Sequence, residues 1–401
     1  MSTNPRALVI GGGVAGPATA LFLQRAGYDV AVFEAYLERA VAGAALAVAP
    51  NGMAVLGELG LADRMIAAGT IIERFSFRTK RGRRLGSMAY APLGRYRFPG
   101  VSLARATFYD ILLEALEARG IPLGLGRRLI RVEQDARGVV AHFADGRVEH
   151  GDILVGADGL RSTVRRLILP DAPEPAFTGL IGAGGFVDRS AMERLVGPKN
   201  GNTMTFCFGP GAFFGYAFGD QGEEKGAYWW HALAREQPLT DAERKALTGE
   251  GGVKALLQAG DGWFDGMREI VAATRTHVAP LDLFDVANLP SWHAGRVVLV
   301  GDAAHAVSPH SGQGASMALE DAIALAKALR DRKAEPAAAF QAYERERRPR
   351  TEKVVELGRR SGGQKQHGRF AALLQTILMP LFLRLAPAPR WLYGHEMRWD
   401  A

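Results

Sequence analysis

The hydrophobic pattern of the chain changes character along its length. Near the N-terminus, short apolar runs flank a helical pattern, which predicts strands at residues 7–10 and 30–33 around a helix over residues 17–26. Between about residues 178 and 276, apolar and polar positions alternate, as is typical of antiparallel strands. A buried strand at residues 297–300 and then helices follow. This order predicts an α/β fold in which an antiparallel sheet is inserted into a Rossmann-like domain, with helices at the C-terminus.

The first turn of the chain has the spacing of a dinucleotide-binding site. Gly11, Gly13 and Gly16 form a G-x-G-x-x-G pattern between the first strand and its helix. Gly11 permits the tight turn, Gly13 lets the backbone approach a pyrophosphate, and Gly16 lets helix and strand pack closely. Glu34 ends the second strand 18 residues after Gly16, and a carboxylate there suits the free ribose 2′-hydroxyl of FAD or NAD. We therefore expect a dinucleotide at this helix N-terminus.

A second strand–turn–helix pattern covers residues 297–322. Asp302 ends the strand and can accept a hydrogen bond from a hydroxyl. The following loop contains Pro309 and leads at Gly314 into a predicted helix over residues 314–330. A glycine-rich turn at a helix N-terminus can hold an anion or a hydrogen-bond acceptor. The pattern indicates a cofactor site without naming the cofactor.

Two capped helices are predicted between these segments. Thr107 and Asp110 resemble a capping box for a helix over residues 108–119, and Arg105 just before it either reaches a phosphate or lies on the surface. A buried strand is predicted just before Asp158, and Ser162 is placed to cap the short helix that follows. Both regions lie within the Rossmann-like part of the sequence.

Aromatic residues mark the predicted antiparallel sheet. Phe214, Tyr216 and Phe218 share one face of their strand, and Trp230 lies on a neighbouring strand. They form either the wall of a pocket for a planar ligand or ordinary core. His231 is a weaker candidate for activating a phenol, since alternation points it away from Trp230. The strands concerned are predicted at residues 203–208, 212–218 and 227–233.

Composition narrows the partners and the compartment. The chain has 401 residues and one cysteine, Cys207, so it forms no intramolecular disulfide and we expect a cytoplasmic protein. The net charge of +7 is scattered rather than gathered in a stripe, which argues against nucleic-acid binding. The apolar run at residues 371–383 is too short to span a bilayer, so no integral membrane segment is expected. The amphipathic stretch around residues 370–385 is expected to pack on the chain or on a second copy, giving a monomer or a homodimer, with membrane-surface binding as the alternative.

Three motifs stand in order along the chain: GGGVAG with a later FE, GADGLRSTVR, and GDAAHAVSPHSGQGASMALEDA. Together with residues 41–61 they resemble the class A FAD-dependent aromatic hydroxylases, the family that includes para-hydroxybenzoate and salicylate hydroxylases. The resemblance spans about residues 5–360. One departure is Ser316, where the family often has asparagine, so we expect a flavin contact there to come from the backbone.

The resemblance implies roles for residues in each motif. Glu34 is expected to bind the adenosine ribose and Asp302 the ribityl chain. Arg105 matches the family's arginine beside the phosphate and the flavin, and Asp158 matches an aspartate associated with both FAD and NAD(P)H. Pro309 is expected to line the flavin and the substrate. The expected cofactor-binding residues are Gly11, Gly13, Val14, Ala15, Gly16, Glu34, Ala35, Arg105, Leu129 (beside the adenine), Asp158, Asp302, Pro309, Gly314 and Ala315 (at the pyrimidine edge); the substrate-pocket candidates are Phe214, Tyr216, Trp230 and Pro309.

The family also implies an activity, and the positions of the dinucleotide elements along the chain predict a division into domains. The expected enzyme is an FAD-dependent monooxygenase that consumes NADPH or NADH and hydroxylates or epoxidises an aromatic or polyketide-like small molecule through a C4a-hydroperoxyflavin, with no metal. The alternatives are a flavin-dependent halogenase or FAD-dependent reductase of the same fold, and a non-enzymatic flavin-bound module. The halogenase signature W-x-W-x-I-P is absent from the sequence. The expected domains are residues 1–75, 100–175 and 275–335 for FAD, 76–99 and 176–274 for the substrate-binding sheet, and 336–401 for the C-terminal helices.

Overall fold

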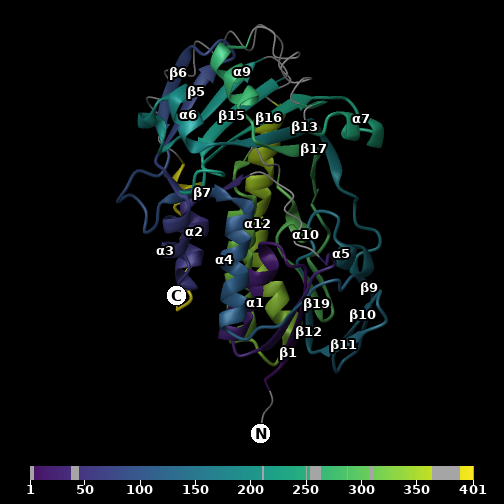
Figure 1. Ribbon diagram of the computed structural model, residues 1–401. Coiled ribbons are helices and arrows are strands. Elements are labelled where there is room, and N and C mark those ends of the chain that lie inside the picture. The colour runs from purple at the N-terminus through teal and green to yellow at the C-terminus, as the bar shows by residue number, and fades with distance from the viewer. Residues whose placement is uncertain are drawn as a thin grey trace.

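The protein consists of a Rossmann-like part with a large sheet stacked on one end of it (Figure 1). In Figure 1 the large sheet lies at the top, and long helices run from it down into the Rossmann-like part. Among the described residues, none of the helices is both long enough and apolar enough to cross a membrane. The computed structural model describes residues 4–37, 45–209, 212–249, 251–252, 263–286, 288–307, 311–363 and 389–400.

A six-stranded sheet is the centre of the Rossmann-like part. The strands from β19 to β8 are parallel, and β18 is added antiparallel at one edge. The central strands are buried along almost their whole length, because a parallel sheet is covered on both faces. In spatial order the strands are β18 (His293–Ala294), β19 (Val297–Leu299), β12 (Ile153–Gly156), β1 (Arg6–Ile10), β2 (Asp29–Phe33) and β8 (Leu123–Gly124).

Helices pack around this sheet and against one another. The helices predicted at residues 17–26 and 314–330 are confirmed as α1 and α11, which pack together over a long contact. The C-terminal helix α12 lies along α11 and contains Pro349. The helices of this part are α1 (Ala15–Arg25), α2 (Pro50–Glu58), α3 (Ala62–Ala68), α4 (Arg105–Ala118), α5 (Thr163–Ile168), α10 (Asp302–His305), α11 (Gly314–Asp331), α12 (Pro336–Gly363) and α14 (Arg390–Tyr393).

Two three-stranded sheets complete the lower part. In one of them, a β-hairpin with strands at residues 129–134 and 139–143 gains a third strand. The other small sheet lies between the Rossmann-like part and the large sheet, so it joins the two. In order, the sheets are β11 (Val148–Gly151), β10 (Val139–Phe143) and β9 (Leu129–Gln134), and β3 (Ala45–Val48), β7 (Gly100–Ala104) and β4 (Thr70–Ile72).

The large sheet has seven strands and is antiparallel except for the β5–β14 pair. The three aromatic strands predicted from alternation are confirmed as β14, β15 and β16. Helices α6 (Arg189–Val196), α7 (Asp241–Ala246) and α9 (Asp265–Ala272), with the 3-10 turn Pro198–Asn200, follow or connect its strands. In order the strands are β17 (Thr276–Asp285), β13 (Ala176–Val187), β16 (Ala227–Ala234), β15 (Ala212–Phe218), β14 (Thr203–Gly209), β5 (Arg74–Thr79) and β6 (Arg84–Ala89).

The large sheet extends beyond two of the boundaries predicted for it, at residues 76 and 274, whereas β13 begins at the predicted residue 176. Strand β17 was placed in the FAD-binding segment, but it pairs with β13 and is an edge strand of the large sheet. Pro280 within it interrupts the alternation, and proline is tolerated at an edge because an edge strand has a row of N–H groups without partners. The last strand of the large sheet therefore ends at Asp285 rather than before residue 275. The sheet's first segment begins at Arg74 rather than at residue 76.

Candidate functional site

The glycine turn after β1 has the geometry expected of it. Gly11 has a φ of 115°, and a Cβ there would lie 2.3 Å from the carbonyl oxygen of Ala157. A Cβ at Gly16 would lie 1.8 Å from the carbonyl oxygen of Gly11, so only glycine allows this approach of helix and strand. At Gly13 a Cβ would meet no described atom within 4 Å, so the backbone there faces open space.

Helix α1 leaves its N-terminus free for an anion. Val14 and Ala15 form the junction between turn and helix, and Val14 provides no side-chain cap. The described first turn holds no acidic residue that would neutralise the positive end of the helix. Backbone N–H groups and the helix dipole therefore point into the space beside Gly13, where the predicted pyrophosphate would lie.

Glu34 folds back over this turn from the end of β2. Its Oε2 accepts from the backbone N–H of Gly12 at 2.7 Å, and its Oε1 accepts from that of Tyr36 at 3.1 Å. A carboxylate has about four acceptor positions, so the group retains capacity for a ribose hydroxyl. The chain around Ala35 runs beside the segment that leads to Leu129, because the carbonyl of Glu34 accepts from the Arg127 N–H at 2.7 Å. This places Leu129, a buried residue, in the same region.

Arg105 and Asp302 approach each other from two segments that are far apart in the sequence. Asp302 is accessible to solvent, but the protein atoms around it partly remove water from its carboxyl, and this desolvation raises the pKa of that carboxyl. The charges of His305 and Arg105 oppose the rise. The Nε of Arg105 is buried and has no hydrogen-bond partner among the described residues. A cation and a carboxylate with free capacity thus face the same space.

The cap predicted for the helix at Arg105 is wrong. Helix α4 begins at Arg105 itself, and its N-cap residue, Ala104, makes no side-chain cap. Thr107 is inside the helix, and its hydroxyl donates to Asp220 Oδ2 at 2.7 Å, while Oδ1 accepts from the Ala104 N–H at 2.7 Å. Asp220 comes from the loop after β15, so a tertiary contact replaces the local capping box.

The start of α11 is a second helix N-terminus with open space beside it. Its N-cap residue, Gln313, provides no side-chain cap, and no acidic residue lies in the described first turn. A Cβ at Gly314 would meet no described atom within 4 Å. Gln313 is fully buried and its Nε2 lacks a partner among the described residues. Gly314 and Ala315 therefore present backbone N–H groups to a neighbouring acceptor.

Ser316 is directed away from that space. Its hydroxyl accepts from the backbone N–H of Ala49 at 3.2 Å, and a Cβ at Gly52 would lie 2.6 Å from the same oxygen. The side chain thus holds the start of α11 against the junction of β3 and α2. The hydroxyl is therefore engaged within the protein, and a flavin contact through the Ser316 backbone stays a prediction.

Asp158 has a structural role in addition to any contact with a cofactor. Its carboxylate accepts from the Ser162 hydroxyl at 2.5 Å and from the backbone N–H groups of Thr163 and Val164 at 2.7 and 3.0 Å. Burial raises the pKa of this carboxyl, and these hydrogen bonds oppose the rise. Ser162 caps α5 as predicted, since its hydroxyl accepts from the Arg165 N–H at 2.9 Å. Asp158 thus fixes the turn that follows β12.

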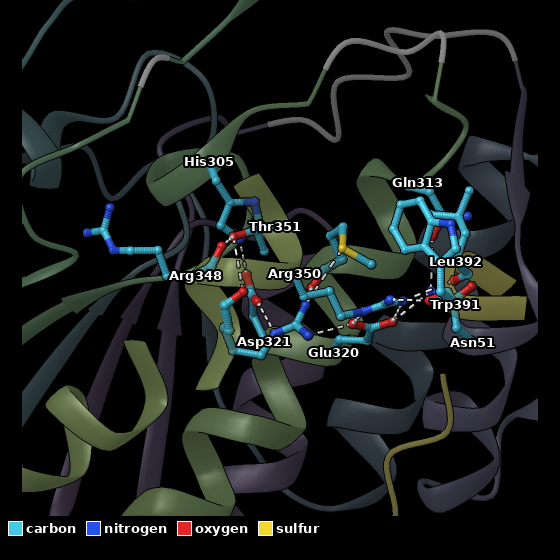
Figure 2. A network of polar contacts seen from close by, with 12 residues as sticks. Asn51, His305, Gln313, Glu320, Asp321, Arg348, Arg350, Thr351, Trp391 and Leu392 are labelled. Atoms are coloured by element: carbon cyan, nitrogen blue, oxygen red, sulfur yellow. Dashed lines mark hydrogen bonds and ion pairs between the residues drawn. The ribbon is translucent and has the colours of Figure 1, made fainter. Parts of the chain in front are cut away.

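A buried network of charges supports the turn at Asp302 (Figure 2). Asp321 of α11 accepts from the Gly301 N–H at 2.9 Å and pairs with Nε2 of His305 at 2.5 Å and with Nε of Arg347 at 2.9 Å. Burial alone would raise the pKa of Asp321, but its contacts with His305 and Arg347 hold that pKa at about 2. Its neighbour Glu320 is fully buried as well.

Glu320 connects the network to α2 and, through Arg350, to the segment that contains Trp391 and Leu392. Its oxygens accept from Arg347 at 2.6 Å, from Arg350 at 2.8 Å and from the Asn51 side chain at 2.7 Å. Arg350 also donates to the carbonyls of Trp391 and Leu392 at 2.6 and 3.0 Å (Figure 2). The sequence interpretation did not include this network. Its signal was present: Glu320 and Asp321 are adjacent acids in the otherwise apolar stretch of residues 317–326, and buried acids need cations.

The aromatic candidates of the large sheet fall on two different faces. Phe214 and Tyr216 are buried in a core with Met267 and Ile270 of α9, on the face that the helices cover. Trp230 lies on the other face, in a cluster with Ala49 and other residues of the lower part. The structure therefore brings Trp230, and not the other two, toward the cofactor segments. His231 points away from Trp230, as predicted, and stacks on Trp229.

Some predicted positions lie outside the described residues. These are Pro309 and the amphipathic stretch around residues 370–385. The described part of the site nevertheless fits FAD. Open space beside Gly13 suits a pyrophosphate, and unpaired donors at Arg105 and Gln313 suit further phosphate or ring acceptors.

Comparison with known proteins gives consistent matches along most of the chain. A family model described as FAD binding domain matches residues 5–357. The chain is 33% identical to 3-amino-4-hydroxybenzoate 2-monooxygenase of Streptomyces cremeus, over 88% of this chain and 86% of that protein. It is 31% identical to aurachin C monooxygenase/isomerase of Stigmatella aurantiaca, over 94% of each. The crystal structure of Klebsiella pneumoniae HpxO with FAD and uric acid has a TM-score of 0.83 and 27% identity, covering 97% of this chain and 95% of that one.

Proposed function

This chain belongs to the class A FAD-dependent aromatic hydroxylases, and we propose that it uses NADPH or NADH to add one oxygen atom to an aromatic or polyketide-like small molecule. The addition is a hydroxylation or an epoxidation. The relatives named above act, according to their names, on an aminohydroxybenzoate and on aurachin C, which supports an aromatic substrate. These substrates differ enough that neither is assigned to this protein by similarity alone.

One observation carries the proposal. Two helix N-termini, at Ala15 and Gly314, lack side-chain caps and lie beside open space. In the described residues, both helices contact the Gly301–Asp302 turn. A Cβ at Gly301 would lie 3.0 Å from the Cβ of Ala15, and Asp321 of α11 accepts from the Gly301 N–H. This arrangement suits an elongated dinucleotide with a phosphate at one helix and an acceptor ring at the other.

FAD, when bound, supplies the electron transfer and the activation of oxygen, so the protein provides binding, orientation and electrostatics. N–H groups at Gly314 and Ala315 would bind the polar edge of the ring and stabilise negative charge there. Asp302 would accept from hydroxyls of the ribityl chain, and Glu34 would accept from the adenosine ribose. Arg105 would donate its unpaired Nε–H to a phosphate or ring acceptor. The apolar face around Trp230 would exclude water from the reacting end.

The test is a substrate screen with purified protein reconstituted with FAD. The rate of NADPH or NADH oxidation is measured with and without each phenolic or polyketide compound. The mass of each product is determined by mass spectrometry. The expected result is stimulation coupled to the gain of one oxygen atom. Protein that holds no FAD after reconstitution, or product formed only with chloride and carrying chlorine, would overturn the proposal.

We further propose that the enzyme works in the cytoplasm as a monomer or a homodimer. Cys207 is buried, and burial raises the pKa of its thiol to about 12, so it is suited to remain a reduced and unreactive side chain. Fractionation of cells and sedimentation of the purified protein test the two points separately.

A further inference from the structure

The face of the large sheet that looks toward the cofactor segments is aromatic and apolar. Tyr228 and Trp230 of β16 lie on this face, and Ala49 and Ala104 of the lower part pack into the same cluster. The Tyr228 hydroxyl is 2.7 Å from the hydroxyl of Ser102 in β7, so the two parts touch directly here. We call this surface the inner face. Its other aromatic members include Phe75, Phe186 and Phe206.

Trp230 lies flat on the inner face. A Cβ on Gly215, which pairs with Trp230 across the strands, would lie 2.4 Å from the indole ring. The indole therefore covers the backbone of Gly215 instead of standing upright from the sheet. It stacks on Tyr228 at 5.5 Å and meets the edge of Phe206 at 5.9 Å, measured between ring centroids. Trp230 is only half-buried, so part of this flat surface is free to contact a ligand.

The inner face carries no positive charge over its four central strands, all of which lie in the described residues except the turn between β14 and β15. Strands β5, β14, β15 and β16 contain three basic residues: Arg74, Arg78 and His231. Strand pairing and alternation place each of these residues on the opposite face of the sheet, which the helices cover. Arg78 is opposite Cys207, and His231 is opposite Phe214, both of which belong to the core beneath the helices.

This distribution of charge limits what the surface can bind. A carboxylate placed against an apolar wall loses its hydration and needs a cation or several donors in return. Strands β5, β14, β15 and β16 offer no cation on this face, and the Tyr228 hydroxyl already pairs with that of Ser102, whereas a neutral ring system gains contact area and stacking on the indole. We propose, resting on the function above, that the substrate places a neutral, planar ring system of more than one ring on Trp230, and that an anionic benzoate-type ring is disfavoured there.

Binding tests this without requiring turnover. The probes are 2-naphthol and 3-hydroxy-2-naphthoate, which share a ring system and differ by a carboxylate. Calorimetry on the FAD-bound enzyme is expected to give an affinity at least about tenfold higher for the neutral probe. Trp230→Leu should weaken binding of the naphthol by about tenfold, because it removes the stacking surface.

The neighbouring residue provides a matched control. Trp229 lies on the helix-covered face, where its Nε1 donates to the Thr274 hydroxyl at 2.8 Å. Trp229→Phe is expected to lower the melting temperature and leave the preference between the two probes unchanged. Gly215→Ala should displace the indole and weaken naphthol binding without a change in FAD content.

The outcomes separate this inference from the proposed function. Tighter binding of the naphthoate, binding of neither probe, or equal effects of the Trp229 and Trp230 substitutions on the preference would each overturn the inference. If anionic phenols are oxygenated and neutral ones are not, the monooxygenase function stands and the inference fails. If neutral probes bind as expected but no aromatic compound is oxygenated, the inference stands and the function fails.

Discussion

The Nε2 atom of His305 lies 2.5 Å from Oδ2 of Asp321, and both side chains are buried. The same carboxylate oxygen accepts from the backbone N–H of Gly301, so one atom of α11 fixes both ends of the short segment that carries Asp302. Arg347 of α12 holds the other oxygen. The position of Asp302 therefore depends on Asp321 and Arg347, which lie 19 and 45 residues later in the sequence.

Removing the carboxylate of Asp321 should destabilise the fold. Asp321→Ala leaves the Nε of Arg347 and the Nε2 of His305 without their acceptor in a buried site, and breaking such a pair costs about 3–5 kcal/mol. The measurement is urea unfolding of the apoprotein. Asp331→Ala at the exposed end of the same helix breaks only the pair with Arg330, and its expected cost is about 0–1 kcal/mol. Similar losses for the two variants would contradict the assigned role of the network.

The parts of the fold that the sequence predicted correctly are those with strong local patterns. Strands β1 and β15 and helix α11 combine a continuous apolar or alternating pattern with clear boundaries at glycine or polar residues. Strand β13 was not predicted, because its sequence AFTGLIGAGGFV contains four glycines, which weaken any strand pattern. At Gly184 a side chain would not fit, because a Cβ there would lie 2.5 Å from the carbonyl oxygen of Trp229 in the neighbouring strand.

Other features depend on contacts that local patterns do not contain. Thr107 looked like a helix cap, but Asp220 takes its hydroxyl, and this partner is 113 residues away. Alternation correctly grouped Phe214 with Tyr216 and separated Trp230 from His231. It did not tell which face α9 would cover, because both faces of the large sheet are apolar. Only the packing of the helices on one face leaves the other face to the cofactor segments.

The glycines of the first turn should respond differently to substitution. Gly13→Ala adds a methyl group in open space, so the apoprotein should keep its melting temperature while FAD affinity falls, because the methyl group enters the phosphate site. Gly16→Ala instead places a Cβ 1.8 Å from the carbonyl oxygen of Gly11 and should destabilise the apoprotein itself. Thermal unfolding without flavin and fluorescence titration with FAD distinguish the two effects. Equal melting temperatures for the two variants would show that the turn is not packed as described.

His231 should make the stability of the protein depend on pH. Burial lowers the pKa of His231 from 6.5 to about 4, so the unfolded chain binds a proton in this range that the folded protein does not. Stability is therefore full above pH 6.5 and decreases as the pH falls toward about 4, by about 3 kcal/mol in total. The slope of unfolding free energy against pH should be smaller in His231→Phe. His150→Phe at an exposed position serves as the control and should retain the slope of the parent protein.

Asp302 should contribute to FAD binding rather than to folding. Its carboxylate is exposed to the space between Arg105 and α11, and desolvation there raises its pKa, so its charge is maintained at a cost to the free protein. Asp302→Ala removes this acceptor for the ribityl hydroxyls and should weaken FAD binding by about 1–3 kcal/mol. Equilibrium titration at low FAD concentration measures the loss. Asp302→Asn keeps an acceptor oxygen and should lose less, since the amide oxygen still accepts a hydroxyl proton without the charge. If flavin occupancy at low FAD is unchanged in Asp302→Ala, the ribityl chain lies elsewhere, and the strand–turn–helix at Gly301 has a structural role alone.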